Sequence, residues 1–105
     1  MNFAERLAGL PGVDPLARLE LTGPQGQSEV IENRPGSAGS VRVYAYLAGK
    51  YGCLDAAAAR EGVEIYAEHS EDARRHPGKH PNIDRLLAIL DGGGPWQVRA
   101  VPVVQ

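Results

Sequence analysis

Glycine and proline divide this chain into short segments, and their positions limit the folds it can adopt. Proline lacks a backbone N–H, and glycine inside a helix or strand costs conformational entropy, so both tend to end regular structure. These residues are concentrated at positions 11–12, 23–26, 34–40, 77–78 and 92–95, with single glycines at 52 and 62. The pattern predicts several short helices and strands, and the length of 105 residues fits one domain.

Four segments are predicted to be strands, and apolar and polar residues alternate in the first and third of them, as is typical of half-buried strands. These segments are residues 17–22, 28–33, 63–69 and 96–104. The first two flank a turn in which Pro24 fixes φ at the first central position, so they predict a β-hairpin. Pro102 cannot donate to a sheet, and the last strand is therefore expected to lie at an edge or to end there.

Five segments are predicted to be helical from apolar spacing, helix propensity or the order of their charges. They are residues 3–10, 41–48, 56–61, 70–76 and 83–90. The clearest is the last, where Ile83, Leu86, Leu87 and Leu90 follow the i, i+3, i+4, i+7 pattern of one helical face. The expected N-caps are Asn2, Asp55, Ser70 and Asn82, and Gly52 is expected to end its helix in the left-handed conformation.

The order of these elements predicts an α+β fold. We expect a small single domain with about four strands in a mainly antiparallel sheet, and with helices packed mostly on one face. Helix 41–48 is expected to be the most buried, and helix 3–10 to pack as a lid on the rest.

Composition and charge argue against several classes of protein. The net charge is −2, from 11 Lys and Arg against 13 Asp and Glu, which disfavours a nucleic-acid partner. Cys53 is the only cysteine, so no disulfide forms within the chain. The N-terminus lacks the pattern of a signal peptide, and no apolar run approaches the roughly 20 residues that span a bilayer. These features predict a cytoplasmic protein without a membrane partner.

The segment from His69 to His80 carries the most distinctive chemistry. Imidazole and carboxylate groups together suit a metal ion or acid–base catalysis near neutral pH. His76 and His80 are four residues apart, but the prolines and glycine around them prevent the helix that would bring them together. We therefore predict no metal site and no cofactor. The predicted ligand- or partner-binding residues are Glu68, His69, Arg74, Lys79 and His80.

A structural explanation accounts for much of this segment. In residues 70–76 the acidic side chains precede the basic ones, as expected in a short helix matched to its dipole. Two histidines are not explained in this way: His69, expected at the core side of a strand end, and His80, held in a proline-rich loop. Each also has a possible structural role. His69 could bond a backbone carbonyl, and the loop could only set the angle of helix 83–90.

A second candidate site precedes helix 41–48. Small residues and a flanking arginine in front of a helix can form an anion cradle, although this run lacks the spacing of a P-loop. Ordinary loop and cap chemistry would look similar. The candidate anion-binding residues are Arg34, Gly36, Ser37, Gly39 and Ser40.

Three segments of the chain, residues 39–44, 67–74 and 80–87, resemble a family of small proteobacterial proteins of unknown function. The likeness covers nearly the whole chain in the same order. It implies a bacterial origin and a stand-alone single-domain protein. It implies no activity and no catalytic residues.

The sequence leaves three functions open and favours binding over catalysis. The favoured one is a domain that binds a small molecule or a protein through the His69–His80 segment. The second is a small hydrolase or lyase, with or without a metal, in which His69 is the general base; it requires Glu68, Asp72 or His80 to approach His69. The third is an assembly protein that forms a homodimer through the C-terminal edge strand, residues 98–104.

Overall fold

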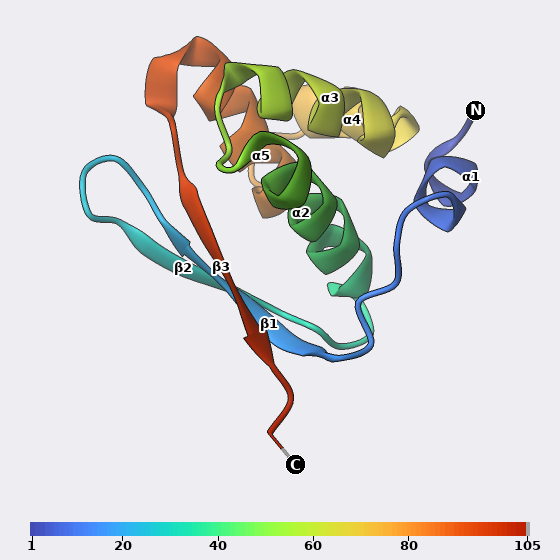
Figure 1. Cartoon of the computed structure of the whole chain (residues 1–105). Coiled ribbons are helices and arrows are strands. Elements are labelled where there is room, and N and C mark those ends of the chain that lie inside the picture. The colour runs from blue at the N-terminus through green and yellow to red at the C-terminus, as the bar shows by residue number, and fades with distance from the viewer. Residues whose placement is uncertain (105) are drawn as a thin grey trace.

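The chain forms five α-helices, a π-helical turn and three strands within residues 1–104, the part that the computed structural model describes (Figure 1). The elements are α1 (Phe3–Ala8), β1 (Leu16–Thr22), β2 (Ser28–Glu32), α2 (Ala38–Tyr51), α3 (Ala56–Tyr66), α4 (Glu68–Arg75), α5 (Pro81–Ala88), the π-helical turn η1 (Ile89–Gly93) and β3 (Gln97–Pro102). None of the described helices is both long and apolar enough to cross a membrane.

The sheet is antiparallel, with strand order β2-β1-β3. The predicted hairpin is confirmed: β1 and β2 are joined by a turn in which the amide of Gly26 donates to the carbonyl of Gly23. Leu19 and Leu21 of β1 are fully buried, while Arg18 and Glu20, which alternate with them, are only partly buried. The last strand lies at an edge and ends at Pro102, as predicted.

The predicted strand at residues 63–69 is wrong, and the sheet has three strands among the described residues instead of about four. Helix α3 continues through Gly62 to Tyr66, and α4 follows after a sharp turn at Ala67, whose φ is 51°. Val63 and Ile65 alternate with polar residues, but Ala59, Val63 and Tyr66 are also spaced along one helical face, and all three are buried. The helical spacing of these residues, and not the alternation, therefore agrees with the structure of this segment.

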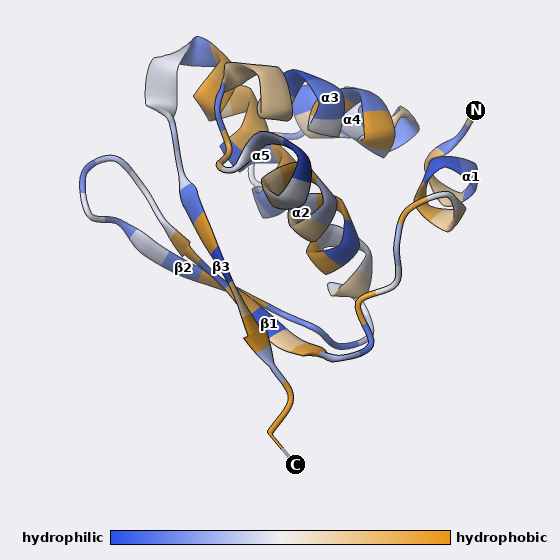
Figure 2. Ribbon diagram, in the orientation of Figure 1, coloured by the Kyte–Doolittle hydropathy of each residue, from blue (hydrophilic) through white to orange (hydrophobic). Residues whose placement is uncertain are grey.

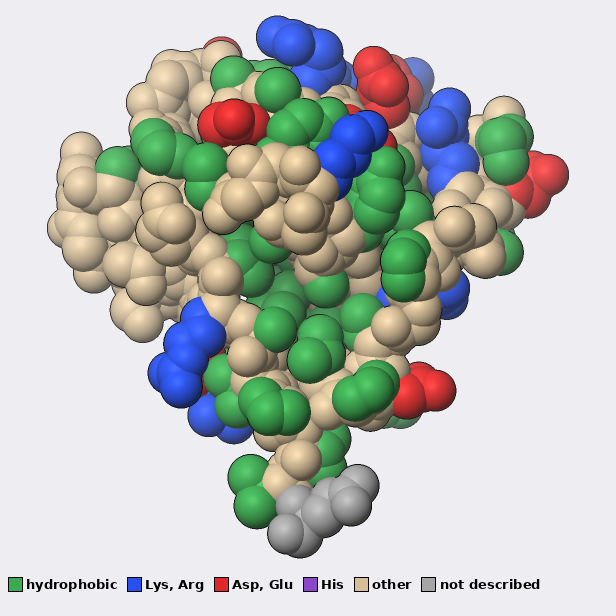
Figure 3. All heavy atoms as spheres, in the orientation of Figure 1, with side chains coloured by type: hydrophobic (Ala, Val, Ile, Leu, Met, Phe, Trp, Pro, Cys, Tyr) green, Lys and Arg blue, Asp and Glu red, His purple; other side chains and the backbone are tan. Residues whose placement is uncertain are grey.

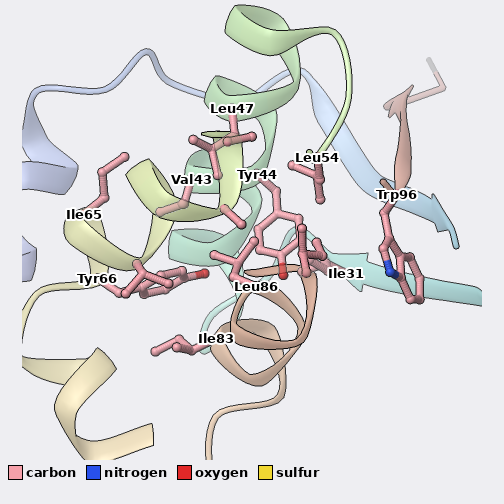
Figure 4. Packing of buried hydrophobic residues seen from close by; sticks show 14 of the residues in the cluster. Ile31, Val43, Tyr44, Leu47, Leu54, Ile65, Tyr66, Ile83, Leu86 and Trp96 are labelled. Atoms are coloured by element: carbon pink, nitrogen blue, oxygen red, sulfur yellow. The ribbon is translucent and has the colours of Figure 1, made fainter. Parts of the chain in front are cut away.

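Helix α2 lies across the sheet, and α3 and α5 pack behind it, so the helices gather on one side of the strands (Figure 1). The apolar faces of the helices turn toward one another and toward the sheet (Figure 2). Side chains from α2, α3 and α5 meet in the core, where Leu47 and Leu86 are fully buried (Figure 4). Gly52 ends α2 with φ 82°, as predicted. Four residues of α2 are fully buried, but α3 has six buried residues, so α2 is not the most buried helix as expected.

Arg85 is a buried cation that ties α5 to the rest of the fold. Its guanidinium donates to the hydroxyl of Tyr44 and to Oδ1 of Asn82, both at 2.9 Å, and pairs with the carboxylate of Glu29 on β2. The hydroxyl of Tyr44 in turn donates to the carbonyl of Asn82. These bonds hold the start of α5 against α2 and the sheet.

Two of the four expected N-caps are confirmed. Asn2 accepts from the amide of Glu5 in a capping box, and Asp55 accepts from the amide of Ala58. Ser70 is not a cap, because α4 begins two residues earlier and the buried Ser70 hydroxyl donates to the carbonyl of Val63. Asn82 lies inside α5, which has Pro81 in its first turn and His80 at the N-cap position.

Helix α1 packs on the helical layer through Phe3 and Leu7, with Leu10 just beyond its end, but none of its residues is fully buried. This agrees with the expected lid. On the face drawn in Figure 3, hydrophobic side chains gather in the centre, and most charged side chains lie toward the periphery.

Candidate functional site

The two candidate sites predicted separately from the sequence meet at one cavity of about 280 Å³, which we call the histidine pocket. It lies among α1, the start of α2, the α3–α4 junction and the loop before α5. Its lining residues are Phe3, Gly36, Gly39, Ser40, Tyr66, His69, Lys79, His80, Pro81, Asn82 and Ile83. Three distant parts of the chain thus contribute polar groups to one pocket.

Phe3, Tyr66 and His69 form an aromatic wall of the histidine pocket. The rings of Phe3 and Tyr66 are stacked with centroids 5.2 Å apart, and His69 meets Phe3 edge-on at the same distance. The sharp turn at Ala67 places His69 in the first turn of α4, not at the end of a strand as predicted. Burial raises the pKa of Tyr66, so its hydroxyl stays protonated and donates to Oγ of Ser40 at 2.7 Å.

His80 is held by a carboxylate. Its Nε2 lies 2.7 Å from Oδ2 of Asp72, and Nζ of Lys79 lies 2.9 Å from the same oxygen. The hydrogen bonds from His80 and Lys79 lower the pKa of Asp72 to about 2, so this carboxylate is ionised at neutral pH. The His80 ring also lies beside the His69 ring, with centroids 5.8 Å apart.

The first turn of α2 borders the pocket with free backbone donors. The amides of Ala38 and Val41 have acceptors, the carbonyls of Arg34 and Ser37. The amides of Gly39 and Ser40 between them have none among the described residues. Gly39 also lies beside α1: an ideal Cβ there would be at ordinary van der Waals distance, 3.5 Å from Leu7 and 3.6 Å from the ring of Phe3.

Within residues 3–100, the sequence matches the family described as "Uncharacterized protein conserved in bacteria (DUF2322)". The chain belongs to this family. The expected bacterial family is thereby confirmed, and its description names no activity. No curated protein and no solved structure matches the chain. The chemistry of this family member must therefore be inferred from its own residues.

Four of the predicted site residues do not line the histidine pocket. Oε1 of Glu68 accepts from the amide of Phe3 at 2.7 Å, which ties α1 to α4. Arg74 pairs with Glu71 at 3.4 Å on the exposed side of α4, and Arg34 lies 4.0 Å from Glu32. The hydroxyl of Ser37 donates to the carbonyl of Glu32. The four residues outside the pocket are therefore Glu68, Arg74, Arg34 and Ser37.

Sequence reasoning missed the apolar part of the pocket. Phe3 and Tyr66 are 63 positions apart, and nothing in the local pattern indicates that they stack. Ile83 was predicted only as a core residue of its helix. For Tyr66, the signal was its helical spacing from Ala59 and Val63, which the alternation of the same segment obscured.

The geometry of the histidine pocket supplies few metal ligands. Within residues 1–104, no three His, Cys, Asp or Glu side chains lie close enough together to hold a metal ion. His69 and His80 form a pair of imidazoles, and the carboxylate beside them, Asp72, is hydrogen-bonded to His80. The arrangement can donate hydrogen bonds, accept a proton and pack against an apolar group.

Proposed function

We propose that this chain binds a small molecule in the histidine pocket. The observation that carries the proposal is the convergence of His69, Lys79, His80 and Ser40, from separate segments, on one cavity with an aromatic wall. Ligand sites are typically concave, with apolar walls and a few convergent polar groups. The volume of about 280 Å³ is near the lower end for such sites, which favours a small ligand over a protein partner.

The polar groups of the pocket are held in place before any ligand arrives. Asp72 bonds both His80 and Lys79, and Asp84 accepts from the amide of Gly78 in the loop that carries them. Groups ordered by the fold lose little further freedom on binding, which favours affinity. This supports a binding role for the loop beyond setting the angle of α5.

The proposal is tested with a fragment library that contains neutral, cationic and anionic compounds. We expect some of them to raise the melting temperature and to shift the NMR signals of pocket amides, because a ligand of the native state stabilises it. The double variant His69→Ala/His80→Ala should keep its fold and lose this binding. The control is Arg74→Ala/Arg75→Ala, whose side chains are exposed and do not line the pocket. Unchanged binding by the His69/His80 variant would overturn the proposal.

A second candidate function is acid–base catalysis on the bound molecule, and the contact between Asp72 and His80 favours it. A carboxylate that orients an imidazole is a common arrangement for a general base. The sequence placed the base at His69, but the carboxylate bonds His80, and His69 has no hydrogen-bond partner among the described residues. In this candidate His80 is the base. It predicts that His80→Gln lowers the turnover of a bound compound by far more than it lowers the affinity for that compound; full turnover by that variant would refute it.

The remaining proposals concern assembly and compartment. Strand β3 is an edge of the sheet, and Val103 and Val104 beyond it are 49% and 92% exposed, which supports pairing with a second copy. A sedimentation experiment that finds only monomer at high concentration would refute the homodimer.

Cytoplasm is the proposed compartment, because Cys53 is a lone free cysteine.

A further inference from the structure

The lining of the histidine pocket is basic. His69, Lys79 and His80 contribute two imidazoles and an ammonium group, and no aspartate or glutamate is among the residues found to line it. The carboxylates of Asp72 and Glu68 contact lining residues without lining the cavity themselves. Such a lining favours a negatively charged ligand over a positively charged one.

The basic side chains of the pocket outnumber the carboxylates that contact them. Asp72 is a single carboxylate that contacts both Lys79 and His80. His69 has no ion-pair partner within residues 1–104; its ring contacts Phe3 and the His80 ring.

Ser40 and the start of α2 add neutral hydrogen-bond donors to the lining. Ser40 accepts the hydrogen of Tyr66 at its Oγ, which leaves its own hydroxyl hydrogen available to an acceptor. The amides of Gly39 and Ser40 have no acceptor among the described residues. An oxyanion has several lone pairs, so it could accept hydrogen bonds from these donors and from the basic side chains together.

From these observations we infer that the ligand carries an anionic oxygen group, a phosphate or a carboxylate, bound between Ser40 and the side chains of His69, Lys79 and His80. This inference rests on the proposed binding function. The rest of the ligand is small and apolar or aromatic, because Phe3, Tyr66 and Ile83 line the same cavity.

The experiment titrates the ¹⁵N-labelled chain with three probes of similar size: phenyl phosphate, benzoate and neutral benzamide. We expect at least one of the two anions to bind about tenfold more tightly than benzamide, as charge-assisted hydrogen bonds are stronger than neutral ones. The bound anion should shift the amide signals of Gly39 and Ser40. The comparison of phenyl phosphate with benzoate distinguishes a phosphate ligand from a carboxylate ligand.

Two variants and one control separate the pocket from general charge attraction. Lys79→Gln and His69→Gln should each weaken binding of the anion about threefold to tenfold. Arg74→Gln removes the same formal charge as Lys79→Gln from outside the pocket and should leave binding within about a factor of two. An equal loss in Arg74→Gln and Lys79→Gln would overturn the inference.

The result also distinguishes this inference from the proposed function. If benzamide binds in the pocket as tightly as both anions, the ligand class is wrong while the binding function stands. If no probe of any charge, and no fragment of the wider library, shifts the pocket amides, the binding function itself fails.

Discussion

Nε2 of His80 lies 2.7 Å from Oδ2 of Asp72, and this contact joins α4 to the loop in front of α5. Lys79 reaches the same oxygen from the same loop. One carboxylate therefore holds two of the polar side chains that line the histidine pocket. The stability of this junction and the geometry of the pocket should respond together to changes at Asp72.

We predict that Asp72→Asn lowers the stability of the chain in a pH-dependent way. The hydrogen bonds from His80 and Lys79 lower the pKa of Asp72 from 3.8 to about 2. A folded-state pKa below the unfolded value contributes stability above the unfolded pKa, and this contribution is lost as the pH falls through the folded pKa. The difference between wild type and Asp72→Asn should therefore be full above pH 4 and shrink toward pH 2.

Urea unfolding at several pH values measures this difference. The pKa of Glu61 is also lowered to about 2, by hydrogen bonds from Lys50, Tyr46 and Tyr51, but Glu61 titrates in both proteins and cancels. Asp91→Asn is the control, because Asp91 is exposed and has no ion pair among residues 1–104. A difference that stays constant from neutral pH to pH 2 would contradict the prediction.

The docking of α1 should depend on Phe3. Its ring stacks on Tyr66 and its amide donates to Glu68, whereas no residue of α1 is fully buried. Phe3→Ala should cost about 1–2 kcal/mol in global stability, from lost apolar and aromatic contact. Amide exchange in α1 should accelerate more than exchange in α2. The control is Met1→Ala, which changes a residue that is 80% exposed and should have no effect. If amide exchange in α1 stays slow in Phe3→Ala, contacts other than Phe3 hold α1 in place.

Local patterns were enough to predict much of the fold. The alternation around Leu19 and the spacing of Ile83 and Leu86 each involve neighbours along the chain, and both predictions agree with the structure. The strand at 63–69 failed because Val63 belongs both to the alternating pattern and to a helical face with Ala59 and Tyr66, and the helix forms. In the helix, Gly62 packs so closely that a Cβ there would meet Leu47 and Leu86. No local pattern in the sequence contains this packing.

The candidate site, like the fold, could be predicted from the sequence only in part. Residue types identified His69, His80, Gly39 and Ser40 as candidates, since imidazoles and a glycine-rich run are visible in the sequence. Their meeting in one cavity depends on how α2 packs against the α3–α4 junction. The orienting partner of His80 could not be predicted either, because the position of Asp72 depends on the turn at Ala67 and on the path of the following loop.

Gly62 and Gly49 provide a paired test of this packing. An ideal Cβ at Gly62 would lie 2.7 Å from Cδ1 of Leu86 and 2.8 Å from Cδ1 of Leu47. Gly62→Ala should therefore lower stability by about 1–3 kcal/mol through overpacking, despite the better helix propensity of alanine. At Gly49 of α2 there is no atom within 4 Å of the added Cβ, so Gly49→Ala should raise stability by about 0.5–1 kcal/mol. Equal effects at the two sites would show that α3 does not pack as described.

The last prediction concerns Arg85, whose side chain is 7% exposed and bonds three partners on different elements. Arg85→Met keeps much of the apolar stem but removes the donors to Tyr44 and Asn82. These polar groups then lose a bond inside the fold, while the half-exposed Glu29 can return to water. We expect a loss of about 1–3 kcal/mol.

Arg85→Lys should restore little of this stability, because one ammonium group cannot reproduce a planar fork that bonds in several directions. Trp96, the only tryptophan, reports the change, since its ring lies 5.5 Å from the Arg85 guanidinium and its fluorescence follows unfolding in urea. Arg99→Met is the control: Arg99 pairs with Glu20 at the surface, and its loss should cost less than about 0.5 kcal/mol. If Arg85→Met and Arg99→Met were equally stable, Arg85 would not hold α5 in place.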